Sequence, residues 1–109
     1  MGRGWIGVDL DGTLAHYDKW VGPEHIGKPI APMVELVKHW LATGKRVKIF
    51  TARVAEPEEA RLALPAIEAW CEAHIGQVLE VTRSKDFQMV ELYDDRCVQV
   101  EHNTGRIIG

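Results

Sequence analysis

The segment from Val8 to Asp18 places two carboxylates two positions apart, directly after an apolar run. Asp9 and Asp11 follow the run Trp5–Val8 and are separated by a single leucine. Side chains at alternate positions of an extended chain point the same way, so both acids would face one pocket. Neighbouring carboxylates repel each other, and Asp is uncommon in strands. We therefore expect the pair to serve chemistry rather than stability.

Other groups that could do chemistry also follow apolar segments of the chain. Each comes at or shortly after the end of a segment that is typical of a strand, and they are Thr51, Lys85, Asp94 and Asp95. In a parallel α/β sheet, functional groups collect just beyond the carboxyl ends of the strands. We therefore expect these residues to share one pocket with the first acid pair.

Four acids in one pocket require a cation, and Mg²⁺ is the simplest choice because it prefers hard oxygen ligands. Gly12 lets the backbone bend after the acids and expose amides to an anion, and Thr13 can cap that bend. Lys85 and the Thr51 hydroxyl would contact the remaining oxygens of a phosphate. A carboxylate, a magnesium ion, a lysine and a hydroxyl are the parts that move a phosphoryl group through an aspartyl-phosphate.

Alternating strands and helices must position these groups. The sequence predicts strands at residues 5–8, 46–50, 77–82 and 90–93, helices from Pro32 to Gly44 and from Glu56 onward, and a C-terminal β-hairpin over 97–108 with its turn at 103–105. Pro65 is expected to kink the second helix or to divide it. Residues 16–31 are irregular and predict a short flap or loop. This alternation is typical of an α/β fold with a parallel sheet.

Composition limits the class of protein. The chain has 109 residues, 46% hydrophobic and 27% charged, which predicts a single domain over 1–109. It contains no apolar run long enough to span a membrane and no export signal, so we expect a cytoplasmic protein. A net charge of −3, with no basic run among aromatics, argues against a nucleic-acid surface. Cys71 and Cys97 lack zinc-site spacing and are expected to be reduced.

The motifs together resemble those of the haloacid dehalogenase-like hydrolase superfamily. DLDGTL (Asp9–Leu14), Thr51, Lys85 and the Asp94-Asp95 pair look like its four motifs in its order. The resemblance implies a Rossmann-like three-layer α/β/α core with a mainly parallel sheet. Residues 16–30 and 54–76 leave no room for a cap domain, so the chain looks like a capless member. An open site of this kind accepts a bulky substrate or borrows a lid from a neighbouring subunit in a homo-oligomer.

The resemblance also implies a role for each motif residue. The chain would be a Mg²⁺-dependent phosphatase, a phosphoric monoester hydrolase, with Asp9 as nucleophile. Asp11 would protonate the leaving oxygen, activate water and bind the metal through its backbone carbonyl. Thr51 and Lys85 would hold the phosphoryl oxygens, Asp95 would bind the metal directly and Asp94 would do so through water. The expected phosphate contacts are Leu10, Gly12, Thr51, Ala52 and Lys85, and the expected metal ligands are Asp9, Asp11, Asp94 and Asp95.

Several alternatives stay open at this point. A phosphotransferase or mutase would use the same groups, whereas a receiver-like phosphoacceptor module would carry its acids in the opposite order. A binding protein without turnover is a third reading. Thr51 could simply cap a turn, and Lys85 could be a surface lysine while Lys48 or Arg53 does its work. Arg53 and Arg96 could meet substrate or form surface ion pairs.

The substrate is open too. We expect a phosphorylated small molecule, such as a nucleotide or a sugar phosphate, or a larger phosphorylated substrate, and no membrane partner. A faint likeness to the nucleotidase branch lies in TRSK (Thr82–Lys85) and YDDR (Tyr93–Arg96). Residues 16–17 and 20–21, placed after the first motif, could touch the leaving group.

Overall fold

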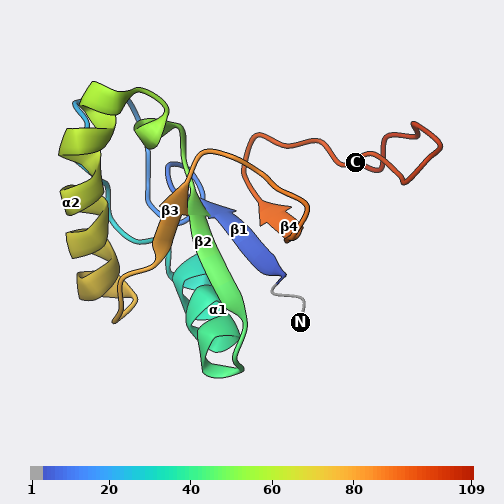
Figure 1. Cartoon of the computed structure of the whole chain (residues 1–109), viewed down its shortest axis with the longest axis horizontal. Helices are drawn as coiled ribbons and strands as arrows, with labels where there is room; N and C mark the ends of the chain where they lie inside the picture. The colour runs from blue at the N-terminus through green and yellow to red at the C-terminus, as the bar shows by residue number, and fades with distance from the viewer. Residues whose placement is uncertain (1–3) are drawn as a thin grey trace.

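The computed structural model describes residues 4–109 and shows a parallel sheet with two α-helices among them (Figure 1). In chain order the elements are β1 (Trp5–Asp9), α1 (Ala31–Ala42), β2 (Arg46–Phe50), the 3₁₀ turn η1 (Ala52–Val54), α2 (Pro57–His74), β3 (Glu80–Thr82) and β4 (Met89–Tyr93). The strand order is β3-β2-β1-β4, and every pair of neighbours is parallel. The predicted α/β class, with a Rossmann-like parallel sheet, is confirmed.

The register of the sheet brings the carboxyl ends of three strands to the same end of the sheet. In β1, Val8 pairs with Ile49 of β2 on one side and with Tyr93 of β4 on the other. The chain therefore leaves all three strands at the same level. Residues that follow these strands lie close together even though β4 is separated from β1 by most of the sequence.

One hydrophobic core joins both helices to one face of the sheet. Its buried members alternate along the strands and recur at helical spacing along the helices, as in Ile6, Val8, Val47, Ile49, Val34, Val37, Trp40, Ile67, Trp70 and Cys71. Right-handed crossovers that run in one direction, from β1 to β2 to β3, place successive helices on the same face. The side chains of β1 alternate between the two faces, which puts Trp5 on the opposite one.

Trp5 covers that opposite face in place of a helix. Its ring lies over Gly7, where an added Cβ would lie 3.0 Å from the ring. Its indole nitrogen donates to Asp86 Oδ1 at 2.9 Å, and Lys48 Nζ lies 4.5 Å from the ring centroid. Among the described residues the structure therefore has two layers, the sheet and one layer of helices. A three-layer α/β/α arrangement was expected. Residues 83–88 connect β3 to β4 and are too few to form a covering helix.

Two predicted helix and strand features differ in detail. The second helix is continuous from Pro57 to His74, so division of the helix, one of the two effects expected at Pro65, does not occur. Pro65 lies on the exposed side of α2, where its ring and its missing amide hydrogen disturb no core contact. β3 begins at Glu80 rather than at residue 77, because only three of its residues pair with β2.

The C-terminal hairpin is reduced to a single bridge. Val100 pairs antiparallel with Ile107, and the Glu101 amide donates to the Arg106 carbonyl at 2.8 Å. The turn lies where it was predicted, with positive φ at Asn103 (63°) and Gly105 (81°). Regular strands do not form here, since the segment extends from the body without a second sheet or helix to cover it (Figure 1). Among the described residues, no helix is both long and apolar enough to cross a bilayer.

Candidate active site

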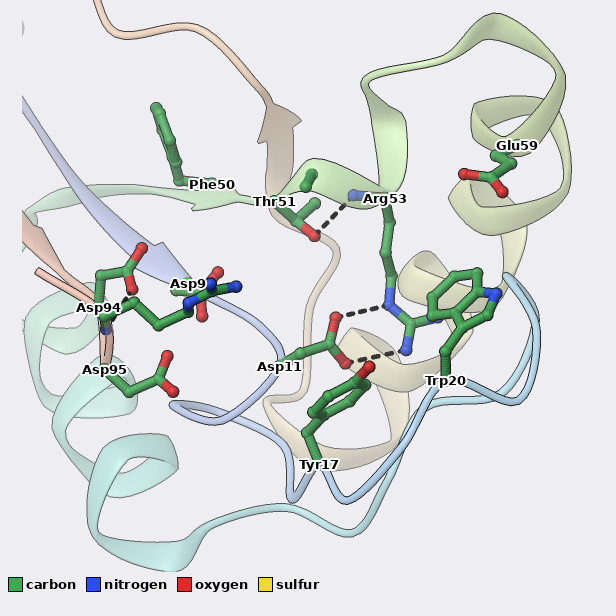
Figure 2. A pocket seen from close by; sticks show the side chains of 12 residues that line it. Asp9, Asp11, Tyr17, Trp20, Phe50, Thr51, Arg53, Glu59, Asp94 and Asp95 are labelled. Carbon is green, nitrogen blue, oxygen red and sulfur yellow. Dashed lines mark hydrogen bonds and ion pairs between the residues drawn. The ribbon is translucent and has the colours of Figure 1, made fainter.

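A cavity of about 500 Å³ opens at the carboxyl ends of β1, β2 and β4 (Figure 2). Its walls combine strand ends, the flap and the first turn of α2, through Asp9, Asp11, Tyr17, Trp20, Phe50, Thr51, Ala52, Arg53, Glu59, Asp94, Asp95 and Arg96. Of the residues predicted for the site, the structure brings Asp9, Asp11, Thr51, Ala52, Asp94 and Asp95 to this cavity. Lys85, Leu10 and Gly12 do not line it.

Three carboxylates converge on one side of the cavity. Asp9, Asp94 and Asp95 each offer an oxygen, and these oxygens lie within 4.8 Å of one another. Burial, together with the nearby Asp94 and Asp95 carboxyl groups, raises the pKa of Asp9 from 3.8 to about 7. A divalent cation relieves repulsion of this kind, and hard carboxylate oxygens are the ligands that Mg²⁺ prefers. The donor set therefore fits the expected metal.

The turn after β1 is fastened to Asp95 by Thr13. The Thr13 hydroxyl accepts from the Asp95 amide at 3.1 Å, and its own hydrogen is within reach of Asp95 Oδ1 at 3.3 Å and Asp9 Oδ2 at 3.5 Å. Sequence reasoning gave Thr13 only a capping role. Its buried position between the first and last motifs makes it the tether that holds two of the carboxylates at a fixed separation.

Gly12 is required by this close approach. Its φ is +88°, and an added Cβ would lie 2.5 Å from Asp95 Oδ2. Its amide donates to the Ala15 carbonyl at 2.8 Å, so that hydrogen bond closes the turn rather than facing a phosphate. The Leu10 side chain is fully buried, and its carbonyl accepts from the amides of Thr13, Leu14 and Ala15. Gly12 thus shapes the turn, and Leu10 anchors it in the core.

Asp11 lies outside the carboxylate cluster because it pairs with Arg53. Arg53 Nε donates to Asp11 Oδ2 at 2.8 Å, and Nη2 donates to Oδ1 at 2.9 Å. Nη1 donates to the Pro23 carbonyl at 2.9 Å, and the guanidinium carbon lies 5.0 Å from the Trp20 ring centroid. Only 5% of Arg53 is exposed, so the alternative of a surface ion-pair residue is wrong. Arg53 joins the acid to the flap (Figure 2).

Thr51 both caps a turn and faces the cavity. Its hydroxyl accepts from the Arg53 amide at 3.1 Å, which caps η1, and its amide donates to the Thr82 carbonyl at 2.9 Å. The residue is only 3% exposed. The hydroxyl hydrogen is not used by the capping bond, so Thr51 can still donate to an anion in the cavity. The capping role and the predicted binding role are therefore compatible.

Lys85 is exposed and lies on the link between β3 and β4, away from the cavity lining. The link must cross from one edge of the sheet to the other, and its turns are fixed by local bonds. The Ser84 backbone amide donates to Thr82 Oγ1 at 3.1 Å, and the Gln88 backbone amide donates to Asp86 Oδ1 at 2.9 Å. Arg96 does line the cavity, and its amide donates to Asp94 Oδ1 at 2.8 Å.

The flap is pinched at its base by strand-like contacts. Ala15 pairs antiparallel with Pro29, and the His16 amide donates to the Lys28 carbonyl at 2.8 Å. Gly27 passes so close that an added Cβ would lie 2.0 Å from the His16 carbonyl oxygen. Its own carbonyl accepts from the Trp70 indole at 2.9 Å. The flap is therefore a fixed loop docked on α2 that supplies Tyr17 and Trp20 to the cavity.

Comparison with family models finds no match, and comparison with curated protein sequences finds none either. Among solved structures, the chain is similar to one described as the conserved protein coded by a locus from Bacteroides thetaiotaomicron. The two share 26% sequence identity with a TM-score of 0.62, over 86% of this chain and 77% of that one. This similarity supports the α/β fold, and the description names no activity.

Proposed function

We propose that the protein is a Mg²⁺-dependent phosphatase that hydrolyses a phosphomonoester through an aspartyl-phosphate on Asp9. The observation that carries the proposal is the convergence of Asp9, Asp94 and Asp95 beside Thr51 at the strand ends. The resemblance of the four motifs to the haloacid dehalogenase-like superfamily supports the same reading. Two free cysteines, one of them exposed, are compatible with a cytoplasmic protein.

The carboxylate cluster would hold the metal. Asp9 and Asp95 are the proposed direct ligands, and Asp94 assists. When bound, the ion supplies positive charge to the phosphoryl oxygens and offsets the repulsion among the acids. The protein itself contributes orientation, because Thr13 and the turn at Gly12 fix Asp95 against Asp9.

The reaction divides between Asp9 and Asp11. A carboxylate oxygen of Asp9 attacks phosphorus, and the bond from phosphorus to the leaving oxygen breaks. Asp11 donates a proton to that leaving oxygen and later takes one from the water that cleaves the acyl phosphate. Both Asp11 oxygens accept from Arg53 in this structure, so this role requires Asp11 to release one Arg53 contact and to carry, on the freed oxygen, the proton that it gives to the leaving oxygen.

Thr51, Ala52 and Arg96 are the proposed contacts of the phosphoryl oxygens. Thr51 contributes its hydroxyl and Arg96 a guanidinium, which suits phosphate oxygens. Arg96 takes the place that the sequence assigned to Lys85, because Arg96 lines the cavity and Lys85 does not. The charge on the transferred group would then be balanced by an arginine from the turn after β4.

The test is release of inorganic phosphate from an aryl phosphate with and without Mg²⁺. We expect turnover that depends on the metal and that Asp9→Asn abolishes. Glu35→Gln, the same acid-to-amide change at an exposed position of α1, should leave the rate unchanged. Equal rates for Asp9→Asn and the unaltered chain would contradict the proposal. Transfer to an added alcohol, with no release to water, would indicate a phosphotransferase instead.

A further inference from the structure

A second cavity adjoins the first and is lined almost entirely by flap residues. It measures about 780 Å³ and shares Asp11, Tyr17 and Arg53 with the first. Small-molecule sites commonly measure about 300–1,000 Å³, and both cavities fall within that range. A phosphoryl group alone needs far less room. The two cavities together offer a path that leads away from Asp9 along the flap.

Two aromatic side chains stand along this path. Tyr17 is 44% exposed and Trp20 is 46% exposed, although both line the first cavity. The Arg53 guanidinium packs against the Trp20 ring and is itself held by Asp11, so the ring is braced from one side (Figure 2). An exposed ring that is held in place beside a cavity is suited to stacking against a flat group.

The charge in the second cavity favours an anion. Asp11 is paired with Arg53, and the remaining carboxylate of the lining, Asp18, lies 3.0 Å from the His16 ring and is outnumbered by two lysines even when His16 is neutral. Lys19 and Lys28 also line the cavity, and within residues 4–109 no acidic oxygen lies within ion-pair distance of either. These two ammonium groups are left to meet a negative group of a ligand.

We propose that the flap forms a leaving-group site for a nucleoside bisphosphate. The reacting phosphate lies at Asp9, the base stacks on Trp20 and Tyr17, and the second phosphate lies near Lys19 and Lys28. This inference rests on the proposed phosphatase function and adds the substrate class. An acyclic phosphate such as glycerol 3-phosphate would leave the aromatic rings uncovered, and a nucleoside monophosphate would leave the lysines without an anion.

The test compares substrates that differ by one group. Adenosine 3′,5′-bisphosphate, adenosine 3′-monophosphate, adenosine 5′-monophosphate and glycerol 3-phosphate are assayed with Mg²⁺ on the full chain. We expect the lowest KM for the bisphosphate and the highest for glycerol phosphate. Trp20→Ala should raise KM for the adenosine compounds about tenfold, the range of base stacking, while kcat changes less than about twofold. Trp20→Phe, which keeps a ring, should recover most of the loss.

The lysines are tested by the difference between bisphosphate and monophosphates. Lys28→Ala should raise KM for the bisphosphate about two- to fivefold, and by more than it raises KM for either monophosphate, because an exposed charge pair contributes little more. Lys45→Ala, at the opposite end of the sheet, is the matched control. Equal KM values for glycerol phosphate and the bisphosphate, or no effect of Trp20→Ala on any substrate, would overturn the inference.

Binding to Asp9→Asn separates this inference from the proposed function. Calorimetry with Mg²⁺ and adenosine 3′,5′-bisphosphate should show binding that Trp20→Ala weakens about tenfold. If no phosphate is released from any compound but this binding pattern holds, the flap site stands and the phosphatase function fails. If phosphate is released while the bisphosphate and glycerol phosphate bind equally, the function stands and the flap site fails.

Discussion

The carboxylate cluster predicts that the stability of the metal-free protein falls as the pH rises. The pKa of Asp9 is raised from 3.8 to about 7, so the folded state holds a proton that the unfolded state releases. The stability from this group is complete below pH 3.8 and is lost as the pH rises through about 7. Asp9→Asn removes the ionisable group and should remove this part of the pH dependence.

The magnitude follows from the size of the pKa difference. One pKa unit corresponds to about 1.4 kcal/mol, so the whole difference would correspond to about 4 kcal/mol. Asp9 is only partly buried, and solvent screening reduces the effect to about 1–2 kcal/mol. For a domain near this size, that loss lowers the midpoint of thermal unfolding by about 5–10 °C.

The assay is thermal unfolding between pH 4 and pH 8, in chelator and in Mg²⁺, for the unaltered chain and Asp9→Asn. All other ionisable groups are common to the two proteins, so the informative quantity is the difference between the unaltered chain and Asp9→Asn. Mg²⁺ should stabilise the unaltered chain more at pH 8 than at pH 5, because protons compete with the ion at Asp9. Parallel curves for the two proteins in chelator would refute the reasoning.

Three further predictions concern single residues. Arg53→Ala should lower the free energy of unfolding by about 2–4 kcal/mol in a denaturant titration, because it leaves Asp11 without its partner. As the control, Arg46→Ala breaks an exposed pair with Glu80 and should lower the free energy of unfolding by under about 1 kcal/mol. Gly12→Ala should lower the free energy of unfolding by about 2 kcal/mol and weaken Mg²⁺ binding about tenfold, because the added methyl group displaces Asp95. Gly44 has a similar φ of +86° but open space around it, so Gly44→Ala should leave Mg²⁺ binding unchanged. Lys85→Ala should change kcat/KM less than about threefold, whereas Arg96→Ala should lower kcat/KM about 10- to 100-fold. A larger loss for Lys85→Ala than for Arg96→Ala would show that the link from β3 to β4 supplies the phosphate contact.

Much of the fold and part of the site were predictable from local sequence patterns. Apolar runs predicted the strands. Because parallel strands have their carboxyl ends on the same side of a sheet, the sequence also predicted that Asp9, Thr51, Asp94 and Asp95 share one pocket. The parts that were not predictable depend on contacts between distant segments. Arg53 is buried because the flap carbonyl of Pro23 and the Trp20 ring close over it, and no local pattern encodes that contact.

The same limit applies to Thr13 and Lys85. Thr13 contacts Asp95 across 82 positions of sequence, a pairing that appears only once β4 is placed beside β1. Lys85 follows a strand, as the predicted pocket required, but the chain after β3 turns at once toward the opposite edge of the sheet. The motifs predicted the order of the site residues along the chain. The path of the link from β3 to β4 determines where Lys85 lies in space.

The pairing of the first strand with the last also has a kinetic consequence. β4 can pair only with β1, whose contacts with it join residues that are far apart in sequence, and closing so large a loop is slow. The last strand is thus expected to dock after the other three have assembled, and Asp94 and Asp95 would arrive with it. A bound ion would then join the two ends of the chain only after the transition state. It should slow unfolding while leaving the rate of refolding nearly unaltered.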